Sequence, residues 1–287
     1  MSDTKPITAK NRLVWAERLA WLALLLALIA AIAGAFVTDL YRDPVQLVEW
    51  MRVNDISVLV AILPFLLISL WGTARGSILG RLVTLGALGA LFYLYMYLAF
   101  SAVVTWVTFL HIAIVGVSFW AIVLTYTSLD AHEAEEVLKA RVPRWPTAGF
   151  LFFMAAITIA HWLPIIYEAA TSGSLPADFI TYEWATNPLM TIELAFIVPL
   201  SLAAGVRLIR HEAGGITFAV PLIVLYTLLN VGLLLSPIIF AINGQSLDTD
   251  LLVFGIVFTI LPLLLLLPIF FRPDTRSHDR IHAAGRA

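Results

Sequence analysis

Several polar residues lie inside long apolar stretches of the chain, where an ionisable or hydrogen-bonding side chain is costly and is therefore a candidate for function. They are His111, His161, Glu193, Tyr226, Asn230, Tyr93 and Tyr97. Glu193 is the hardest to explain by packing alone, because a carboxylate buried in hydrocarbon must be paired or protonated. Together these side chains predict a binding site for a small ligand or ion.

The spacing of these residues places most of them in one layer. Tyr93 and Tyr97 are four positions apart, as are Tyr226 and Asn230, so each pair shares one face of a helix. At about 1.5 Å per residue, His111 lies near the middle of a bilayer, and the others lie nearer its outer surface. The inner half is almost purely apolar apart from the helix ends. This layering predicts a polar pocket that opens outward and is closed below by apolar packing.

Glu193 is expected at the floor or wall of that pocket, with its carboxylate turned toward the neighbouring helices. The expected partners of the carboxylate are His161, Tyr226 or Asn230, which lie at similar depth on those helices. On this interpretation, glutamine at position 193 keeps the fold, because an amide still forms hydrogen bonds, but it abolishes ligand or ion binding.

Catalytic chemistry finds less support in the sequence. His111, His161 and Glu193 are permitted zinc ligands, but no His-Glu-x-x-His pattern places two such ligands on one helix. None of the serines in the spans has the flanking pattern of a nucleophile, and no apolar span holds a lysine for a retinal Schiff base. The chain has no cysteine, and its two membrane histidines could hold one haem at most. The cofactor therefore stays unknown, and an enzyme is the less favoured interpretation.

These residues belong to a very apolar chain. Of its 287 residues, 61% are hydrophobic and 13% are charged, with a mean hydropathy of +0.95. Soluble domains carry about 25% charged residues, so a soluble globular enzyme is excluded, as is a disordered chain. The net charge is −2 and there is no basic stripe, which excludes direct nucleic-acid binding. The composition predicts a polytopic protein whose main partner is the lipid bilayer.

The apolar residues form continuous stretches that are long enough to cross a bilayer as helices, which takes about 20 residues each. These stretches lie at about 17–37, 56–73, 82–100, 102–127, 147–169, 189–209, 215–235 and 251–271. The third and fourth join almost directly at Phe100 and Ser101, which predicts a tight hairpin. The first is too long for a cleaved signal peptide, and no small-residue cleavage site follows it. The predicted fold class is an all-α transmembrane bundle with eight spans.

Lys and Arg are distributed unequally between the segments that link these spans. With the N-terminus inside, fifteen of them fall on the inner side, and only Arg42 and Arg52 fall on the outer side. Basic residues favour the cytoplasmic side, so both termini are expected in the cytoplasm and the protein in the cell membrane. The outer segments carry nine acidic residues, which would concentrate cations at the mouth of a site.

The two long outer loops share a pattern. Each contains Glu-Trp and then an asparagine, Asn54 or Asn187, at the expected start of the next helix, and that helix contains a proline. The likeness predicts two parallel four-helix repeats related by an axis along the membrane normal. Their expected boundaries are residues 1–140 and residues 141–287. Both asparagines are expected to cap their helices, with a ligand role as the alternative.

The segments between the spans also have expected structures. Residues 44–51 have apolar residues at helical spacing, which predicts a short helix in the outer interface, anchored by Trp50. Trp184 is expected to anchor the second outer loop in the same way. Residues 128–146 are predicted to form an amphipathic connector between the halves, and the arginines of the tail from Arg272 are expected at anionic lipid headgroups.

Two runs of the sequence carry a resemblance to known proteins. They are LFYLYMYLAFSAVVTWVTFLHIAIVGVSFWAIVL and ATNPLMTIELAFIVPLSLAAG, the second with Thr-Asn-Pro from Thr186 and an acid at Glu193. Over roughly residues 54–235 the chain is similar to an uncharacterised family of multi-pass prokaryotic membrane proteins with no assigned function. In that family a His is expected near Thr191 and a Tyr at His111, and this chain departs from both. The resemblance implies a membrane fold and location, and no activity.

Three interpretations of function remain open. The favoured one is a small-molecule or ion binding or transport protein, whose ligand reaches an outward-facing site between the two halves. The second is a non-catalytic subunit of a membrane complex or homo-oligomer, in which the polar layer only packs helices together. The third is a membrane-embedded metal-dependent enzyme that uses His111, His161 and Glu193.

Overall fold

The computed structural model describes residues 9–184 and 186–271, and every element within these ranges is a helix. Eight helices in the described ranges are long and apolar enough to cross a membrane. The expected all-α bundle is therefore confirmed, and the chain is an integral, multi-pass membrane protein.

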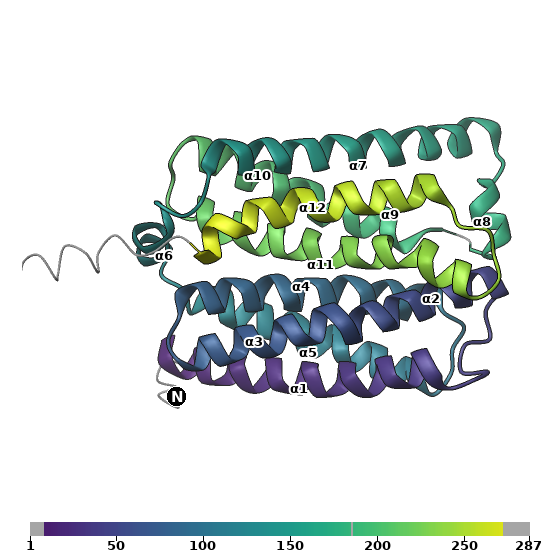
Figure 1. Cartoon of the computed structure of the whole chain (residues 1–287), viewed down its shortest axis with the longest axis horizontal. Helices are drawn as coiled ribbons and strands as arrows, with labels where there is room; N and C mark the ends of the chain where they lie inside the picture. The colour runs from purple at the N-terminus through teal and green to yellow at the C-terminus, as the bar shows by residue number, and fades with distance from the viewer. Residues whose placement is uncertain (1–8, 185, 272–287) are drawn as a thin grey trace, which may run out of the picture.

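The spans run side by side, with the short helices α6 and α8 at opposite ends of the bundle (Figure 1). The first four spans are α1 (Ala9–Phe36), the continuous series α2 (Val45–Ser57), η1 (Val58–Ile62) and α3 (Leu63–Ala74), then α4 (Ile78–Ser101) and α5 (Val107–Thr127). The last four are α7 (Arg144–Ser172), the continuous series α9 (Pro188–Ile192), η2 (Glu193–Ile197) and α10 (Val198–Ile209), then α11 (Gly215–Ile242) and α12 (Thr249–Phe271). The short helices are α6 (Ala131–Leu138) and α8 (Ala177–Thr181).

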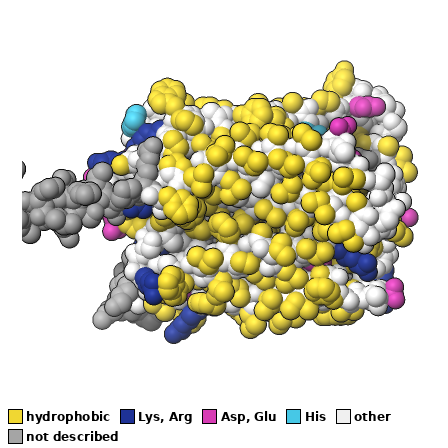
Figure 2. Space-filling view, viewed as in Figure 1, with side chains coloured by type: hydrophobic (Ala, Val, Ile, Leu, Met, Phe, Trp, Pro, Cys, Tyr) yellow, Lys and Arg dark blue, Asp and Glu magenta, His cyan; other side chains and the backbone are white. Residues whose placement is uncertain are grey.

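The two ends of the bundle differ in charge. Figure 2 shows Lys and Arg gathered mainly at the end that carries α6, acidic side chains mainly at the end that carries α8, and a broad hydrophobic band between them. We call these the basic end and the acidic end. Large apolar side chains are exposed along the spans, for example Ile68, Phe109 and Val253. Exposed apolar area of this extent marks a surface that lipid or another protein covers.

α4 and α11 form the centre of the bundle. They are the most buried of the spans, and they pack against each other. Gly86 of α4 permits this approach, because a Cβ atom there would lie 2.6 Å from the carbonyl oxygen of Pro221. The helices α3 and α5 cover α4, and α10 and α12 cover α11.

Some features of the structure favour an internal duplication, and others do not. A π-helical turn precedes a proline in the second span of each expected half, since η1 is followed by Pro64 and η2 by Pro199. A π turn widens the helix locally, and proline removes a backbone donor, so both spans carry the same irregularity. In contrast, α1 packs extensively against α5, whereas α7 and α12 share few contacts. The duplication stays a prediction.

The expected start of the second span is wrong. Residues 44–51 do not form a separate interfacial helix, because α2 continues without a break through η1 into α3, giving one helix over Val45–Ala74. Asn54 lies inside this helix and does not cap it. Asn187 does cap α9, since its Oδ1 accepts a hydrogen bond from the Leu189 backbone N–H at 2.9 Å.

Two other expectations concern the outer segments. The third and fourth spans form the expected hairpin, since α4 and α5 pack against each other, but the five non-helical residues 102–106 link them in place of a direct junction at Phe100 and Ser101. Trp50 packs edge-on against Phe240, with ring centroids 5.1 Å apart, and Trp184 packs against Tyr182 at 4.9 Å. Both tryptophans therefore hold chain segments together, and their expected role as anchors in the membrane interface stays a prediction.

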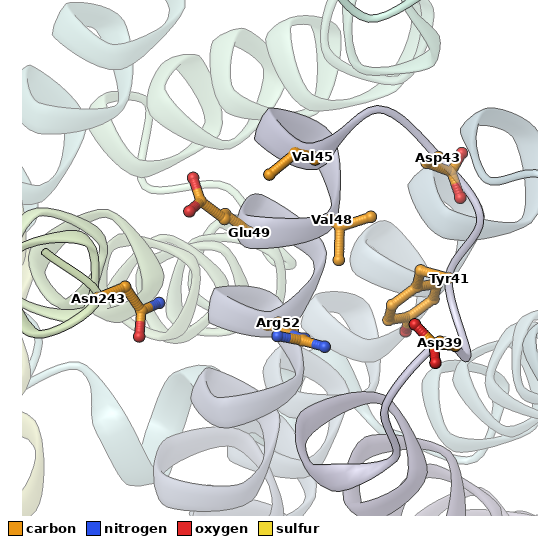
Figure 3. Close-up of a pocket in the computed structure, with 8 residues that line it drawn as sticks. All are labelled: Asp39, Tyr41, Asp43, Val45, Val48, Glu49, Arg52 and Asn243. Atoms are coloured by element: carbon orange, nitrogen blue, oxygen red, sulfur yellow. The ribbon is translucent and has the colours of Figure 1, made fainter. Parts of the chain in front are cut away.

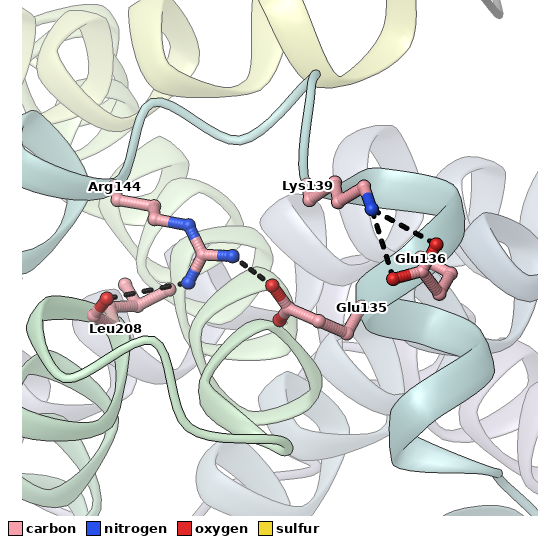
Figure 4. A network of polar contacts seen from close by, with 5 residues as sticks. All are labelled: Glu135, Glu136, Lys139, Arg144 and Leu208. Atoms are coloured by element: carbon pink, nitrogen blue, oxygen red, sulfur yellow. Dashed lines mark hydrogen bonds and ion pairs between the residues drawn. The ribbon is translucent and has the colours of Figure 1, made fainter.

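The predicted amphipathic connector is present as α6, and it ties the basic end together (Figure 4). Lys139 pairs with Glu136 at 2.9 Å. Glu135, which has the right spacing for Lys139, pairs instead with Arg144 of α7. Arg144 also donates to the Leu208 carbonyl of α10 at 3.4 Å. The tail from residue 272 lies outside the described residues.

Candidate functional site

A pocket of about 360 Å³ opens at the acidic end, between the segment before α2, α2 itself and the end of α11. It is lined by Asp39, Tyr41, Asp43, Val45, Val48, Glu49, Arg52 and Asn243 (Figure 3). Three carboxylates against one guanidinium give the pocket a negative lining, and the two valines add apolar surface. A cavity of this size and charge can take a small cation.

Hydrogen bonds hold two of the pocket carboxylates. Asp43 Oδ1 accepts the backbone N–H of Val103 at 2.8 Å, and Glu49 Oε2 accepts the side-chain amide of Gln245 at 2.6 Å. Burial raises the pKa of Asp43 above its ordinary value, and the backbone hydrogen bonds offset this effect in part. Asp43 is therefore protonated at a higher pH than an ordinary surface aspartate.

Tyr41 connects the pocket with a buried carboxylate. The Tyr41 hydroxyl donates to Asp55 Oδ2 at 2.7 Å, and Asp55 is 0% exposed. Burial, and next the nearby Asp55 charge, raise the pKa of Tyr41, so the phenol keeps its proton and remains a donor. The other oxygen, Asp55 Oδ1, has no hydrogen-bond partner among the described residues.

Two more buried rings complete what we call the Asp55 cluster: Tyr41, Asp55, Tyr95 and His111. The Tyr95 hydroxyl donates to a backbone carbonyl of α1 at 3.2 Å. The His111 ring lies 5.5 Å from the Tyr95 ring and 6.4 Å from the Tyr41 ring, measured between centroids. Within the described part of the chain, neither ring nitrogen of His111 has a partner. Gly34 of α1 closes the cluster, because a Cβ atom there would overlap Asp55 Oδ2.

A second group of polar side chains, the Glu193 cluster, consists of Glu193, Tyr93 and Trp162. Glu193 begins η2, and its two oxygens accept the Tyr93 hydroxyl of α4 and the Trp162 indole N–H of α7, the latter at 2.6 Å. The carboxylate is half-buried and points toward the third and fifth spans, so its expected inward orientation is confirmed. Two donors stabilise a charge that is otherwise costly at this depth.

The other predicted residues on this side form different bonds. The Tyr226 hydroxyl lies 3.0 Å from a serine hydroxyl of α10. Asn230 donates to a backbone carbonyl of α12 at 2.9 Å, so it joins α11 to α12. The Tyr97 ring packs edge-on against Trp184, with centroids 6.0 Å apart. Each of the three side chains therefore links its helix to a neighbouring element, and this structural role explains its presence.

α4 separates the two clusters. Tyr93 and Tyr95 are two positions apart, which is about 200° around a helix, so they face opposite ways. Tyr93 and Tyr97 face the second half of the chain, whereas Tyr95 and His111 belong to the Asp55 cluster in the first half. The single polar layer that the sequence suggests is therefore two separate groups, and neither His111 nor Glu193 lines the pocket.

The expected pairing of Glu193 with His161 is wrong. The His161 side chain is exposed on α7, and the adjacent Trp162 is the residue that donates to Glu193. The enzyme interpretation needs His111, His161 and Glu193 in one place, and the structure does not bring them together. Across the described residues, no group of three His, Asp or Glu side chains could hold a metal ion.

Sequence reasoning missed Tyr41, Asp55, Tyr95 and Trp162. Asp55 had a signal that could have found it, since it follows Met51 by four residues on the stripe that is buried along α2. That stripe runs through the segment interpreted as an outer loop, so Asp55 falls among the nine acidic residues assigned to the outer segments. The two tyrosines and Trp162 had no signal beyond being amphipathic residues within or beside apolar stretches.

Comparisons with other proteins do not add to this description. No family model, curated protein or solved structure matches the chain. The resemblance suggested by the runs around His111 and Glu193 therefore brings no activity to this protein, and its function has to be argued from its own residues.

Proposed function

We propose that this protein binds a small cation at the outer face of the cell membrane and serves as a binding or transport protein for it. The observation that carries the proposal is the acidic pocket, whose lining includes Asp39, Asp43 and Glu49. The pocket shares Tyr41 with the Asp55 cluster, so it adjoins a carboxylate inside the membrane domain. A solute bound here is next to an ionisable group that lies along one of the spans.

The chemistry of the lining favours a primary ammonium compound with a short apolar chain. An ammonium group donates up to three hydrogen bonds, which the pocket carboxylates can accept. Val45 and Val48 offer contact to the apolar chain. Arg52 offsets part of the negative charge, which favours a monovalent cation over a divalent one.

The expected topology becomes part of this proposal. The acidic end faces outward and the basic end faces the cytoplasm, in keeping with the preference of Lys and Arg for the inner side. A homo-oligomer or a partner in a membrane complex is compatible with it, because exposed apolar faces can be covered by protein as well as by lipid. The Glu193 cluster is the second candidate binding site.

Single cysteines test the topology directly, because the chain has none of its own. Ser174 lies after α7 at the acidic end, and Glu133 lies on α6 at the basic end. We expect a membrane-impermeant maleimide to label Ser174→Cys in intact cells, and to label Glu133→Cys only after permeabilisation. A reporter fused after Ala287 should be active only in the cytoplasm. The reverse labelling pattern would place the pocket on the cytoplasmic side and refute the outward orientation.

Ligand-dependent stability tests the pocket. Ethylammonium is expected to raise the unfolding temperature of the purified protein in lipid nanodiscs, since a ligand at about 100 times its Kd stabilises the folded state by about 2.7 kcal/mol. The effect should vanish in the double variant Asp43→Asn/Glu49→Gln. Asp248→Asn and Asp250→Asn are the matched controls, because both acids lie near α12 at the same end but not in the pocket. Tetramethylammonium, which donates no hydrogen bond, should stabilise less, and equal stabilisation by ethyl sulfate would contradict cation selectivity.

The same binding should depend on pH. Cation binding needs the Asp43 carboxylate, and burial raises its pKa. Ethylammonium affinity should therefore be highest at neutral pH and fall as the pH drops through the range in which Asp43 gains a proton. Asp43→Asn should flatten this part of the profile, and a profile unchanged by the substitution would exclude Asp43 as the titrating group.

A further inference from the structure

The Asp55 cluster lies beside the pocket, and its chemistry does not depend on the solute that occupies the pocket. We propose that Asp55 is a proton-carrying residue of the membrane domain and that it exchanges its proton with the pocket through Tyr41. The inference goes beyond cation binding, because it concerns a carboxyl group that no solute in the pocket needs to touch.

Burial is the first argument. Asp55 is 0% exposed, and the charge of an isolated carboxylate in such surroundings is not stabilised by water. One oxygen accepts the Tyr41 hydroxyl, and the other has no partner within the described ranges. No Lys or Arg among the described residues forms an ion pair with it. The carboxyl group is therefore stable in this site as the protonated, neutral acid.

The surroundings favour a proton over a metal ion. Sodium and calcium need a shell of several oxygen ligands, whereas the cluster offers the Asp55 carboxylate and two phenols. The Tyr95 hydroxyl already donates to a carbonyl of α1. His111 adds an imidazole, which exchanges protons but is a poor ligand for hard cations. One proton on Asp55 needs none of these ligands.

The ionisable groups around Asp55 come from each element that packs on it. The segment before α2 brings Tyr41, with Asp43 acting on Tyr41 from the pocket, α4 brings Tyr95, and α5 brings His111. From α1 the close neighbour is Gly34, which has no side chain. Both tyrosines are phenols that stay neutral, so protonation of the cluster is carried by Asp55, with His111 as its one basic neighbour among the described residues.

Tyr41 provides the route for a proton between the pocket and Asp55. Its hydroxyl is bonded to Asp55 Oδ2, and its side chain also lines the pocket. In the inward step a hydronium ion in the pocket gives a proton to the Tyr41 oxygen while the original hydroxyl proton passes to Asp55 Oδ2. One O–H bond of tyrosine breaks and another forms, water is left in the pocket, and the carboxylate becomes a carboxylic acid. The outward step is the reverse.

Infrared difference spectroscopy in lipid bilayers, recorded between neutral and alkaline buffer, tests the proposal. The wild-type protein should show the carbonyl band of a protonated carboxylic acid at neutral pH. The band should be absent in Asp55→Asn, which is nearly isosteric and keeps an acceptor for Tyr41. It should persist in Glu193→Gln, the matched variant of the other membrane carboxylate. A band that survives in Asp55→Asn would overturn the proposal.

A measurement on the wild-type chain covers the case in which Asp55→Asn does not fold. Labelling the aspartate carboxyl carbons with ¹³C should shift the band, whereas labelling the glutamate carboxyl carbons should not. The exchange rate of the band in D₂O tests the route, and Tyr41→Phe should slow it by about a hundredfold. Tyr226→Phe, which removes another buried hydroxyl, should leave it unchanged. A band that does not shift with labelled aspartate refutes the proton on Asp55, and unchanged exchange in Tyr41→Phe refutes the route.

Discussion

Replacement of Gly34 by alanine should destabilise the protein by about 1–3 kcal/mol, the range found for overpacked interiors. A Cβ atom at Gly34 would overlap Asp55 Oδ2 and lie 2.6 Å from the Tyr41 hydroxyl oxygen. Neither group can move easily, because they are bonded to each other and are buried between helices. Unfolding of the reconstituted protein by increasing amounts of sodium dodecyl sulfate measures the loss.

Gly116→Ala is the matched control for this prediction. Gly116 also lies within a span, but nothing lies within 4 Å of the position of its Cβ atom. Alanine should therefore be neutral or stabilising there, by up to about 1 kcal/mol. In the double variant Gly34→Ala/Asp55→Ala part of the clash is removed, so the two losses should not add. Equal behaviour of Gly34→Ala and Gly116→Ala would mean that α1 does not pack on Asp55 in this way.

Replacement of Glu193 should separate the need for an acceptor from the need for a charge. Leucine leaves the Tyr93 hydroxyl and the Trp162 indole N–H without their acceptor, which costs about 1–3 kcal/mol for each buried donor. Glutamine retains both contacts, because its carbonyl can accept from Trp162 and its amide can donate to the Tyr93 oxygen. We therefore expect Glu193→Leu to unfold at clearly lower detergent concentration than Glu193→Gln.

Two further variants make the result specific. Tyr93→Phe should lose part of its effect on stability in the Glu193→Leu background, because the contact it removes is already gone. Glu168, an exposed acid near the end of α7, provides the control, and its leucine and glutamine variants should be equally stable. If Glu193→Leu and Glu193→Gln were equally stable, the carboxylate would face lipid or headgroups rather than α4 and α7.

The spans were predictable from the sequence because each is a continuous apolar run, and lipid exposure demands such a run. The second span was the exception. Its first turns carry Glu49, Arg52 and Asp55, and these charges resemble a loop when only mean hydropathy is considered. The helical stripe of buried residues through Leu47 and Met51 continues the span outward, and periodicity in this stretch was the better guide.

The candidate site was only partly predictable, for a geometric reason. Glu193 stood out because a charge inside an apolar run needs an explanation, and its inward direction was correctly expected. Its partner was not, since His161 and Trp162 are adjacent and the 100° turn between neighbours decides which one faces the bundle. Seven of the eight pocket residues lie within 39–52, but the cavity also needs the end of α11 at Asn243, and the local sequence does not specify that approach.

Equilibrium binding of radiolabelled ethylammonium to the protein in nanodiscs is the most direct test of the central claim, that the acidic pocket holds a small cation. The account predicts saturable binding to the wild-type protein, loss of that binding in Asp43→Asn/Glu49→Gln, and wild-type binding in Glu193→Gln. Loss of binding in Glu193→Gln with normal binding in the pocket variant would contradict the account and place the cation site at the Glu193 cluster.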